Sequence, residues 1–195
     1  MDSPRTLLSW IGAADLRASA ADPGAREGPI CQAAKALAPE RVLVLSDYDA
    51  ERSEQFVRWL QASVSCRVGL RCVDLTSPTD FREIFQAVSA LLAEIEQQRD
   101  AYPGLTYHLS PGTPAMAAVW ILLAKSIFPA DLIESSPERG VRFVEIPFDI
   151  AADFLPSVLE HQGRSLERLS AAIPPEGARF DDIVYRSPQM QCAVE

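Results

Sequence analysis

The stretch LTYHLSPGTPAMAAVWILLAKSIF, residues 105–128, decides the fold of this chain. Leu105–Leu109 has the short apolar pattern of a buried strand, and a turn of small residues follows it. Thr113 is suited to cap a helix and Pro114 to occupy its first position, so an apolar helix is predicted over Ala115–Phe128. A strand that passes through a tight turn into a helix is the repeating unit of a parallel α/β sheet.

The same alternation of strand and helix extends on both sides of this stretch. Further strands are predicted at Thr6–Ile11, Arg41–Ser46, Cys66–Cys72, Asp131–Glu134 and Val141–Pro147. Further helices are predicted at Pro29–Leu37, after a capping Asp49, and from Phe81 to Ile95. For the last of these, Ser77 is predicted as the cap, with Pro78 and Asp80 in the first turn. A polar loop is predicted from Ala13 to Gly28. The predicted fold is therefore α/β: a doubly wound, mostly parallel Rossmann-like sheet with helices on both faces.

Composition excludes several functional classes. The 195 residues carry a formal net charge of -9, which argues against a nucleic-acid coat that relies on many phosphate contacts. The longest uninterrupted apolar stretch, Ala115–Ala124, is shorter than the roughly 20 residues that a membrane-spanning helix needs. The N-terminus lacks the layout of a signal peptide. We therefore expect a cytoplasmic protein with no membrane partner.

Two turns at the carboxyl ends of predicted strands form the candidate ligand site. The first strand is followed by Gly12, Ala13, Ala14 and Asp15, and the fourth by Ser110, Pro111, Gly112 and Thr113, with Met116 in the helix beyond. In a Rossmann-like sheet these two strands flank the point where the strand order reverses and ligands bind. Free amides at a helix start, with nearby hydroxyls, favour a phosphate. The alternative is that Gly, Thr and Pro serve the turn geometry alone.

The other candidate residues also have two interpretations each. Arg17 is the best-placed cation for an anionic ligand, or else a solvated residue of the predicted loop. Ser46 and Tyr48 follow the second strand and are placed to contact a ribose, or they only precede a capped helix. His108 is either a base beside the fourth-strand turn or a packed, hydrogen-bonded strand residue.

The sequence carries no signature of a cofactor or a metal. It has neither the G-x-G-x-x-G pattern of dinucleotide binding nor the G-x-x-x-x-G-K-[ST] pattern of a P-loop. The four cysteines include no C-x-x-C pair, and the two histidines stand alone. NAD binding and NTP hydrolysis are therefore disfavoured, and we expect no cofactor and no metal.

Five segments of the chain carry a resemblance to a known family: WIGAADLR (10–17), HLSPGTPAMA (108–117), FPA (128–130), LIESSP (132–137) and VEIPFDI (144–150). Together they resemble the CRISPR-associated Rossmann fold (CARF) domains. They are most similar to the sensory domain of RtcR-like regulators, the sigma-54-dependent activators of RNA-repair operons. The tail FDDIVYRSPQMQ, residues 180–191, is similar to the segment that opens the AAA+ domain of such activators, with Tyr185 where the family usually has Gly.

The resemblance implies a domain layout and a set of partners. It implies a CARF-like ligand-sensing domain in residues 1–150, a helical extension in 151–173, and in 174–195 a linker and the start of a AAA+ domain that this chain lacks. The sensing domain would form a homodimer, with one symmetric pocket for a cyclic oligoadenylate or for RNA that ends in a 2′,3′-cyclic phosphate. This ligand would control the downstream ATPase. Sigma-54 RNA polymerase and DNA would be reached only through the missing downstream domains.

The resemblance also assigns roles to residues. Ligand contacts fall on Gly12–Asp15 in the first turn, and on Ser110, Pro111, Gly112, Thr113 and Met116 in and after the second. Trp10 and Tyr48 are aromatics on which bases could stack, and Arg17 would hold phosphates. Ring-opening CARF enzymes commonly have hydroxyl or basic residues where this chain has Ala13 and Ala14, so no catalytic residue is expected.

Two alternative functions remain open at this stage. One is a metal-independent ring nuclease, in which a ribose 2′-hydroxyl of a cyclic oligoadenylate attacks its own phosphate. The other is a dimerisation module in which residues 151–172 are the working part.

Overall fold

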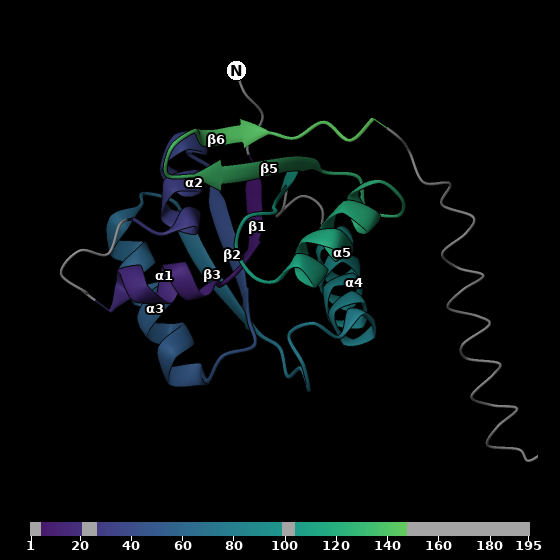
Figure 1. Ribbon diagram of the computed structural model, residues 1–195, viewed down its shortest axis with the longest axis horizontal. Helices are drawn as coiled ribbons and strands as arrows, with labels where there is room; N and C mark the ends of the chain where they lie inside the picture. The colour runs from purple at the N-terminus through teal and green to yellow at the C-terminus, as the bar shows by residue number, and fades with distance from the viewer. Residues whose placement is uncertain (1–4, 21–26, 99–103, 148–195) are drawn as a thin grey trace, which may run out of the picture. The chain divides into compact units, whose positions relative to one another are not determined.

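One six-stranded sheet organises the residues that the computed structural model describes, 5–20, 27–98 and 104–147 (Figure 1). Its strands are β1 Thr6–Trp10, β2 Arg41–Ser46, β3 Arg67–Cys72, β4 Leu105–His108, β5 Asp131–Ser136 and β6 Gly140–Phe143. The helices are α1 Ala13–Ser19, α2 Pro29–Leu37, α3 Ala50–Ser63, α4 Phe81–Gln97 and α5 Pro114–Ala124. The helical extension predicted for 151–173 and the linker predicted for 174–195 lie outside the described residues.

The strand order confirms the predicted fold class. The order across the sheet is β3-β2-β1-β4-β5-β6, and every neighbouring pair is parallel except the β5–β6 hairpin. Leu8 in β1 lies between Leu43 of β2 and Tyr107 of β4. The chain order therefore reverses at β1, and β1 and β4 flank the reversal as predicted.

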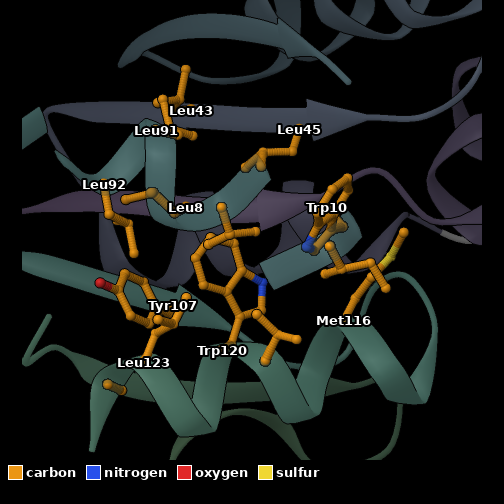
Figure 2. Close-up of a cluster of buried hydrophobic side chains, with 14 of the residues drawn as sticks. Leu8, Trp10, Leu43, Leu45, Leu91, Leu92, Tyr107, Met116, Trp120 and Leu123 are labelled. Atoms are coloured by element: carbon orange, nitrogen blue, oxygen red, sulfur yellow. The ribbon is translucent and has the colours of Figure 1, made fainter. Parts of the chain in front are cut away.

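Helices cover both faces of the sheet, because alternate strand residues point to opposite sides. Helices α4 and α5 pack on one face, where Trp120 stacks on Tyr107 with ring centroids 4.5 Å apart (Figure 2). On the opposite face α1, α2 and α3 pack against a second buried cluster that includes Leu7 and Val44. In the part of the chain that the structure describes, no helix is long and apolar enough to cross a membrane.

Four local predictions were wrong. The helix predicted to reach Phe128 ends at Ala124, and the last strand, predicted over Val141–Pro147, is Gly140–Phe143. The loop predicted from Ala13 to Gly28 begins with helix α1, which Gly12 caps and whose Leu16 is buried. The sequence AADLRAS hides this helix, because it offers one large apolar residue in two turns. Helix α4 begins at Phe81 with Asp80 as its N-cap, and not at Ser77 and Pro78: the Asp80 carboxylate accepts a hydrogen bond from the Glu83 amide at 3.0 Å.

Candidate functional site

The turns after β1 and β4 touch each other at the point of strand reversal. A Cβ atom on Gly12 would lie 3.1 Å from the Gly112 amide nitrogen and 3.4 Å from Pro111 Cα. Gly112 has a φ of +90°, and a Cβ atom there would lie 2.8 Å from Met116 Sδ and 3.1 Å from Trp10 Cβ. Gly112 thus requires glycine for its backbone conformation and its contacts, and Gly12 favours glycine because the second turn approaches it closely. Two turns that are about 100 residues apart in sequence form one backbone surface.

Asp15 ties the first turn to the start of helix α2. Its buried carboxylate accepts hydrogen bonds from the Gly12 amide at 3.1 Å and from the Ile30 amide at 2.9 Å. Gly28 leaves room for it, since a Cβ there would lie 2.6 Å from Asp15 Oδ1. Burial raises the pKa of Asp15 to about 6, although the hydrogen bonds from the Ile30 and Gly12 amides act in the opposite direction. Asp15 therefore positions the turn from inside and does not face a ligand.

The hydroxyls of the second turn are also used within the fold. Thr113 caps α5 as predicted: its Oγ1 accepts from the Met116 amide at 3.3 Å and donates to the Pro78 carbonyl at 2.7 Å. Ser110 Oγ accepts from the Ser135 amide at 2.7 Å. The sulfur of the buried Met116 accepts a hydrogen bond from the Thr113 amide at 3.4 Å. These groups hold the turn to the loop before α4 and to β5, so the polar surface that remains is mainly backbone.

Two candidate residues are buried too deeply to meet a ligand. Trp10 is fully buried in the cluster under α4 and α5, so the expectation that a base stacks on it was wrong (Figure 2). Ser46 is also fully buried, and its hydroxyl lies 2.7 Å from that of Ser53 and accepts from the Tyr48 amide. For Ser46 the structure supports a role in the helix start and not a ribose contact.

His108 is a packed strand residue and not a base. Its ring nitrogens lie 3.3 Å from Ser9 Oγ and 2.8 Å from Ser135 Oγ, which joins β1, β4 and β5 through buried polar atoms. Burial lowers the pKa of His108 to about 3. The imidazole is therefore neutral at pH 7 and its position is fixed by the two hydroxyls.

The exposed members of the predicted set lie along the first turn and α1. Ala13, Ala14 and Arg17 are exposed, as are Ser110 and Gly112 in the second turn. Ala13 and Arg17 also line a pocket of about 240 Å³ between α1 and the start of α3, together with Tyr48. The surface at the strand reversal is thus backbone and small side chains, with a cationic pocket beside it.

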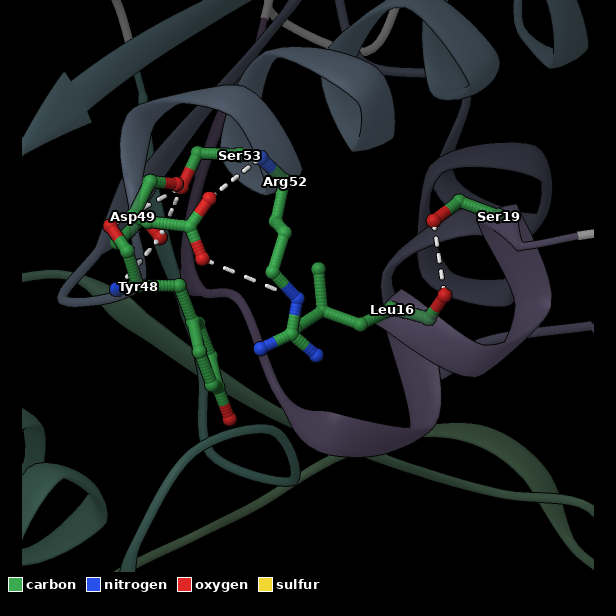
Figure 3. Close-up of polar contacts among 7 residues, drawn as sticks. Leu16, Ser19, Tyr48, Asp49, Arg52 and Ser53 are labelled. Carbon is green, nitrogen blue, oxygen red and sulfur yellow. Dashed lines mark hydrogen bonds and ion pairs between the residues drawn. The ribbon is translucent and has the colours of Figure 1, made fainter.

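The pocket is lined by three polar residues that were not predicted from the sequence, Ser19 of α1 and Arg52 and Gln55 of α3. Arg52 Nε lies 3.9 Å from Asp49 Oδ2, and its guanidinium lies 5.5 Å from the centroid of the Tyr48 ring (Figure 3). In the sequence Arg52 and Gln55 have the pattern of a solvated helix face, and only the packing of α1 against α3 brings them to the same pocket as Arg17. The described residues contain no group of three or more His, Cys, Asp or Glu side chains arranged to hold a metal ion.

No protein-family model matches this sequence, and no curated protein matches it. Among solved structures, Csm6 from Enterococcus italicus bound to cyclic hexa-2′-fluoro-hexa-dAMP is similar, with a TM-score of 0.61 and 16% sequence identity over 84% of this chain and 45% of that chain. Can2 from Sulfobacillus thermosulfidooxidans in complex with cyclic tetra-adenylate has a TM-score of 0.51 and 17% identity over 72% of this chain and 34% of that chain.

Protein VC1899 from Vibrio cholerae gives a TM-score of 0.51 at 8% identity, over 76% of this chain and 35% of that chain. The chain spans less than half the length of each of these three proteins. At such low identities the likeness concerns the fold alone. In its described residues, the chain has the mixed α/β, Rossmann-like fold that CARF-domain proteins such as Csm6 and Can2 share.

Proposed function

We propose that this chain is a regulatory domain that senses an RNA-derived phosphorylated ligand at the Gly12–Gly112 turns. The observation that carries the proposal is the meeting of these two turns at the strand reversal, where Gly12 packs against the backbone of the second turn and Gly112 adopts a φ of +90° against Met116 and Trp10. Ligands of open α/β sheets bind at this place. Two proteins of the same fold were solved with cyclic adenylates, which supports this ligand class.

The surface suits a phosphodiester more than a base-specific ligand. Exposed Ala13, Ala14 and Gly112 let a ligand backbone approach the main chain, and Arg17 supplies the positive charge. A two-fold homodimer would present each turn twice, which matches a ring that is itself two-fold symmetric. We therefore propose a homodimer with one ligand between its subunits, either a cyclic oligoadenylate or RNA with a 2′,3′-cyclic phosphate end.

The regulatory role rests on the resemblance of the sequence to RtcR-like sensory domains. In that role, ligand binding favours one arrangement of the dimer, and this preference controls an ATPase domain of a sigma-54-dependent activator. The ring-nuclease alternative receives less support from the site. Asp15 and His108, which could act as acid or base beside the turns, are buried and hydrogen-bonded within the fold.

The first test is a thermal-shift and calorimetric titration of the 195-residue chain. The ligands are cyclic tri-, tetra- and hexa-adenylate, and a 2′,3′-cyclic-phosphate-ended RNA. A ligand at 100 times its Kd stabilises the native state by about 2.7 kcal/mol, which raises the Tm by several degrees. Recovery of the intact ligand after overnight incubation with excess protein supports a sensor, whereas a cleaved ring supports the nuclease.

A charge substitution tests the place of binding. Ala13→Asp adds a carboxylate to the exposed first turn without straining the backbone, since an acid in the first turn of a helix is favourable. At about 5 Å from a ligand phosphate, with an effective dielectric constant near 20, repulsion costs about 3 kcal/mol, or roughly a hundred-fold in affinity. Ala62→Asp adds the same charge in the last turn of α3 and is the control. Equal affinities of the two variants would contradict the proposed site.

A further inference from the structure

The pocket between α1 and α3 is a defined cavity beside the strand reversal. It is lined by Ala13, Leu16 and Arg17 from α1, by Tyr48 before α3, and by Arg52 and Gln55 from α3. Its volume of about 240 Å³ is below the roughly 300–1,000 Å³ of sites that hold drug-sized ligands. It can therefore take part of an oligonucleotide and not the whole molecule.

Arg52 is held in place at the edge of this pocket. Asp49 caps α3, receiving the Arg52 amide at 3.0 Å, and its other carboxylate oxygen lies 3.9 Å from Arg52 Nε. The Tyr48 ring lies under the guanidinium at 5.5 Å. Figure 3 shows the two terminal nitrogens of Arg52 pointing away from Asp49 toward the α1 side. Because the ion pair with Asp49 involves Nε, the two terminal nitrogens stay available to hold a phosphate.

Arg17 faces the same pocket from α1, and within the described part of the chain it has no ion-pair partner. Two guanidinium groups thus share one cavity in a protein with a formal net charge of -9. Asp49 offsets one of these charges, so the cavity keeps a positive balance. Such a local concentration of positive charge favours an anionic ligand.

The remaining walls of the pocket suit the base of a nucleotide. The pocket-facing Tyr48 and Leu16 supply aromatic and apolar surface for a planar base. Gln55 carries an amide that both donates and accepts hydrogen bonds, as a base edge requires. Ala13 belongs to the first turn and to the pocket wall, so a ligand that lies on the Gly12–Gly112 turns extends into the pocket without leaving the surface.

We infer that the α1–α3 pocket is a nucleotide subsite, in which Arg17 and Arg52 hold one phosphate and Tyr48 packs against the attached base. This inference rests on the proposed function and names where one unit of its ligand sits. It assigns binding roles to Arg52 and Gln55, which lie outside the two turns.

Affinity measurements on variants of the 195-residue chain test the subsite, with cyclic tri-, tetra- and hexa-adenylate and the cyclic-phosphate-ended RNA as probes. Arg17→Ala and Arg52→Ala should each weaken binding about ten- to hundred-fold, the range for hydrogen bonds to charged groups. Tyr48→Leu, which keeps apolar volume and removes the ring, should weaken binding several-fold. Arg58→Ala is the matched control, because Arg58 is on the same helix, is exposed and pairs with Glu54 outside the pocket.

The outcomes separate the subsite from the proposed function. If the wild-type chain binds a probe and the Arg17→Ala and Arg52→Ala variants match the Arg58→Ala control, the subsite is overturned and the sensing role stands. If the wild-type chain binds none of the three cyclic adenylates and does not bind the cyclic-phosphate-ended RNA, both proposals fall. Because Arg17 and Arg52 are exposed, their variants should keep the Tm of the unliganded protein, which excludes misfolding as the cause of lost affinity.

Discussion

Asp15 and His108 should make the stability of this domain respond to pH in opposite directions. The folded pKa of Asp15, about 6, is above its ordinary value of 3.8, so the stability that it contributes is present below about pH 4 and is lost as the pH rises through 6. The folded pKa of His108, about 3, is below its ordinary 6.5, so its contribution is present above pH 6.5 and is lost as the pH falls toward 3. Between pH 7 and pH 5 the two effects oppose each other.

The size of each effect follows from these pKa values. Lowering the pH from 7 to 5 should raise the free energy of unfolding by about 1 kcal/mol through Asp15 and lower it by about 2 kcal/mol through His108. The two contributions partly cancel, so the wild-type protein should respond to pH less than His108 alone would make it respond. Substitution of either residue should leave the pH dependence of the other one visible in the unfolding free energy.

The assay is urea unfolding at pH 7 and pH 5, followed by the fluorescence of the fully buried Trp10 and Trp120. For each protein the measured quantity is its own change in unfolding free energy between the two pH values, so a general loss of stability in a variant cancels. Relative to wild type, Asp15→Asn should lose about 1 kcal/mol more on acidification, and His108→Gln should gain about 2 kcal/mol.

Two results would refute the reasoning. If either variant shows the wild-type pH change to within about 0.5 kcal/mol, the corresponding buried group does not titrate as its surroundings require. If Asp15→Asn and His108→Gln both deviate in the same direction, the opposed signs are wrong.

Two further substitutions test the packing of the second turn. Gly112→Ala should lower the unfolding free energy by about 2–5 kcal/mol, because it strains a residue at φ +90° and places a Cβ 2.8 Å from Met116 Sδ. Gly140→Ala is the control: Gly140 has a φ of +69° with nothing within 4 Å of the added Cβ, so this change should cost only about 1–2 kcal/mol. Equal midpoints of urea unfolding for these two variants would contradict the contact argument. Thr113→Val removes the α5 cap and the hydrogen bond to Pro78 while keeping the side-chain shape, so it should cost about 1–3 kcal/mol. A urea midpoint unchanged from wild type would show that this hydroxyl is dispensable.

The elements that the sequence predicted well share one property: their signals are local. The run Arg41–Ser46 has the apolar content of a buried strand and is strand β2 to the residue. Thr113 and Pro114 predict the start of α5, because a cap and a first-turn proline act within one helical turn. The stripe from Phe81 to Ile95 predicts α4 in the same way.

Local signals also explain the errors. The N-cap of α4 is Asp80 and not Ser77, because the Asp80 carboxylate accepts a hydrogen bond from the Glu83 amide. Both residues are suited to cap a helix, so the local sequence does not decide between them. Trp10 looked like a stacking platform because it ends a strand beside a small-residue turn. Its side chain points into the cluster under α5, and that direction depends on which face of β1 the helices cover.

By itself the sequence determined the strand–helix alternation, and with it the parallel sheet and the chemistry of each turn, because capping, turn preference and apolar periodicity act over a few residues. The tertiary structure decided everything that depends on segments far apart in the chain. It set Gly12 against Gly112, enclosed Asp15 and His108 so that their pKa values move in opposite directions, and faced Arg17 toward Arg52 across a pocket. These features arise from the packing of distant elements, which fixes distance, burial and charge at once, and no local pattern of residues specifies them.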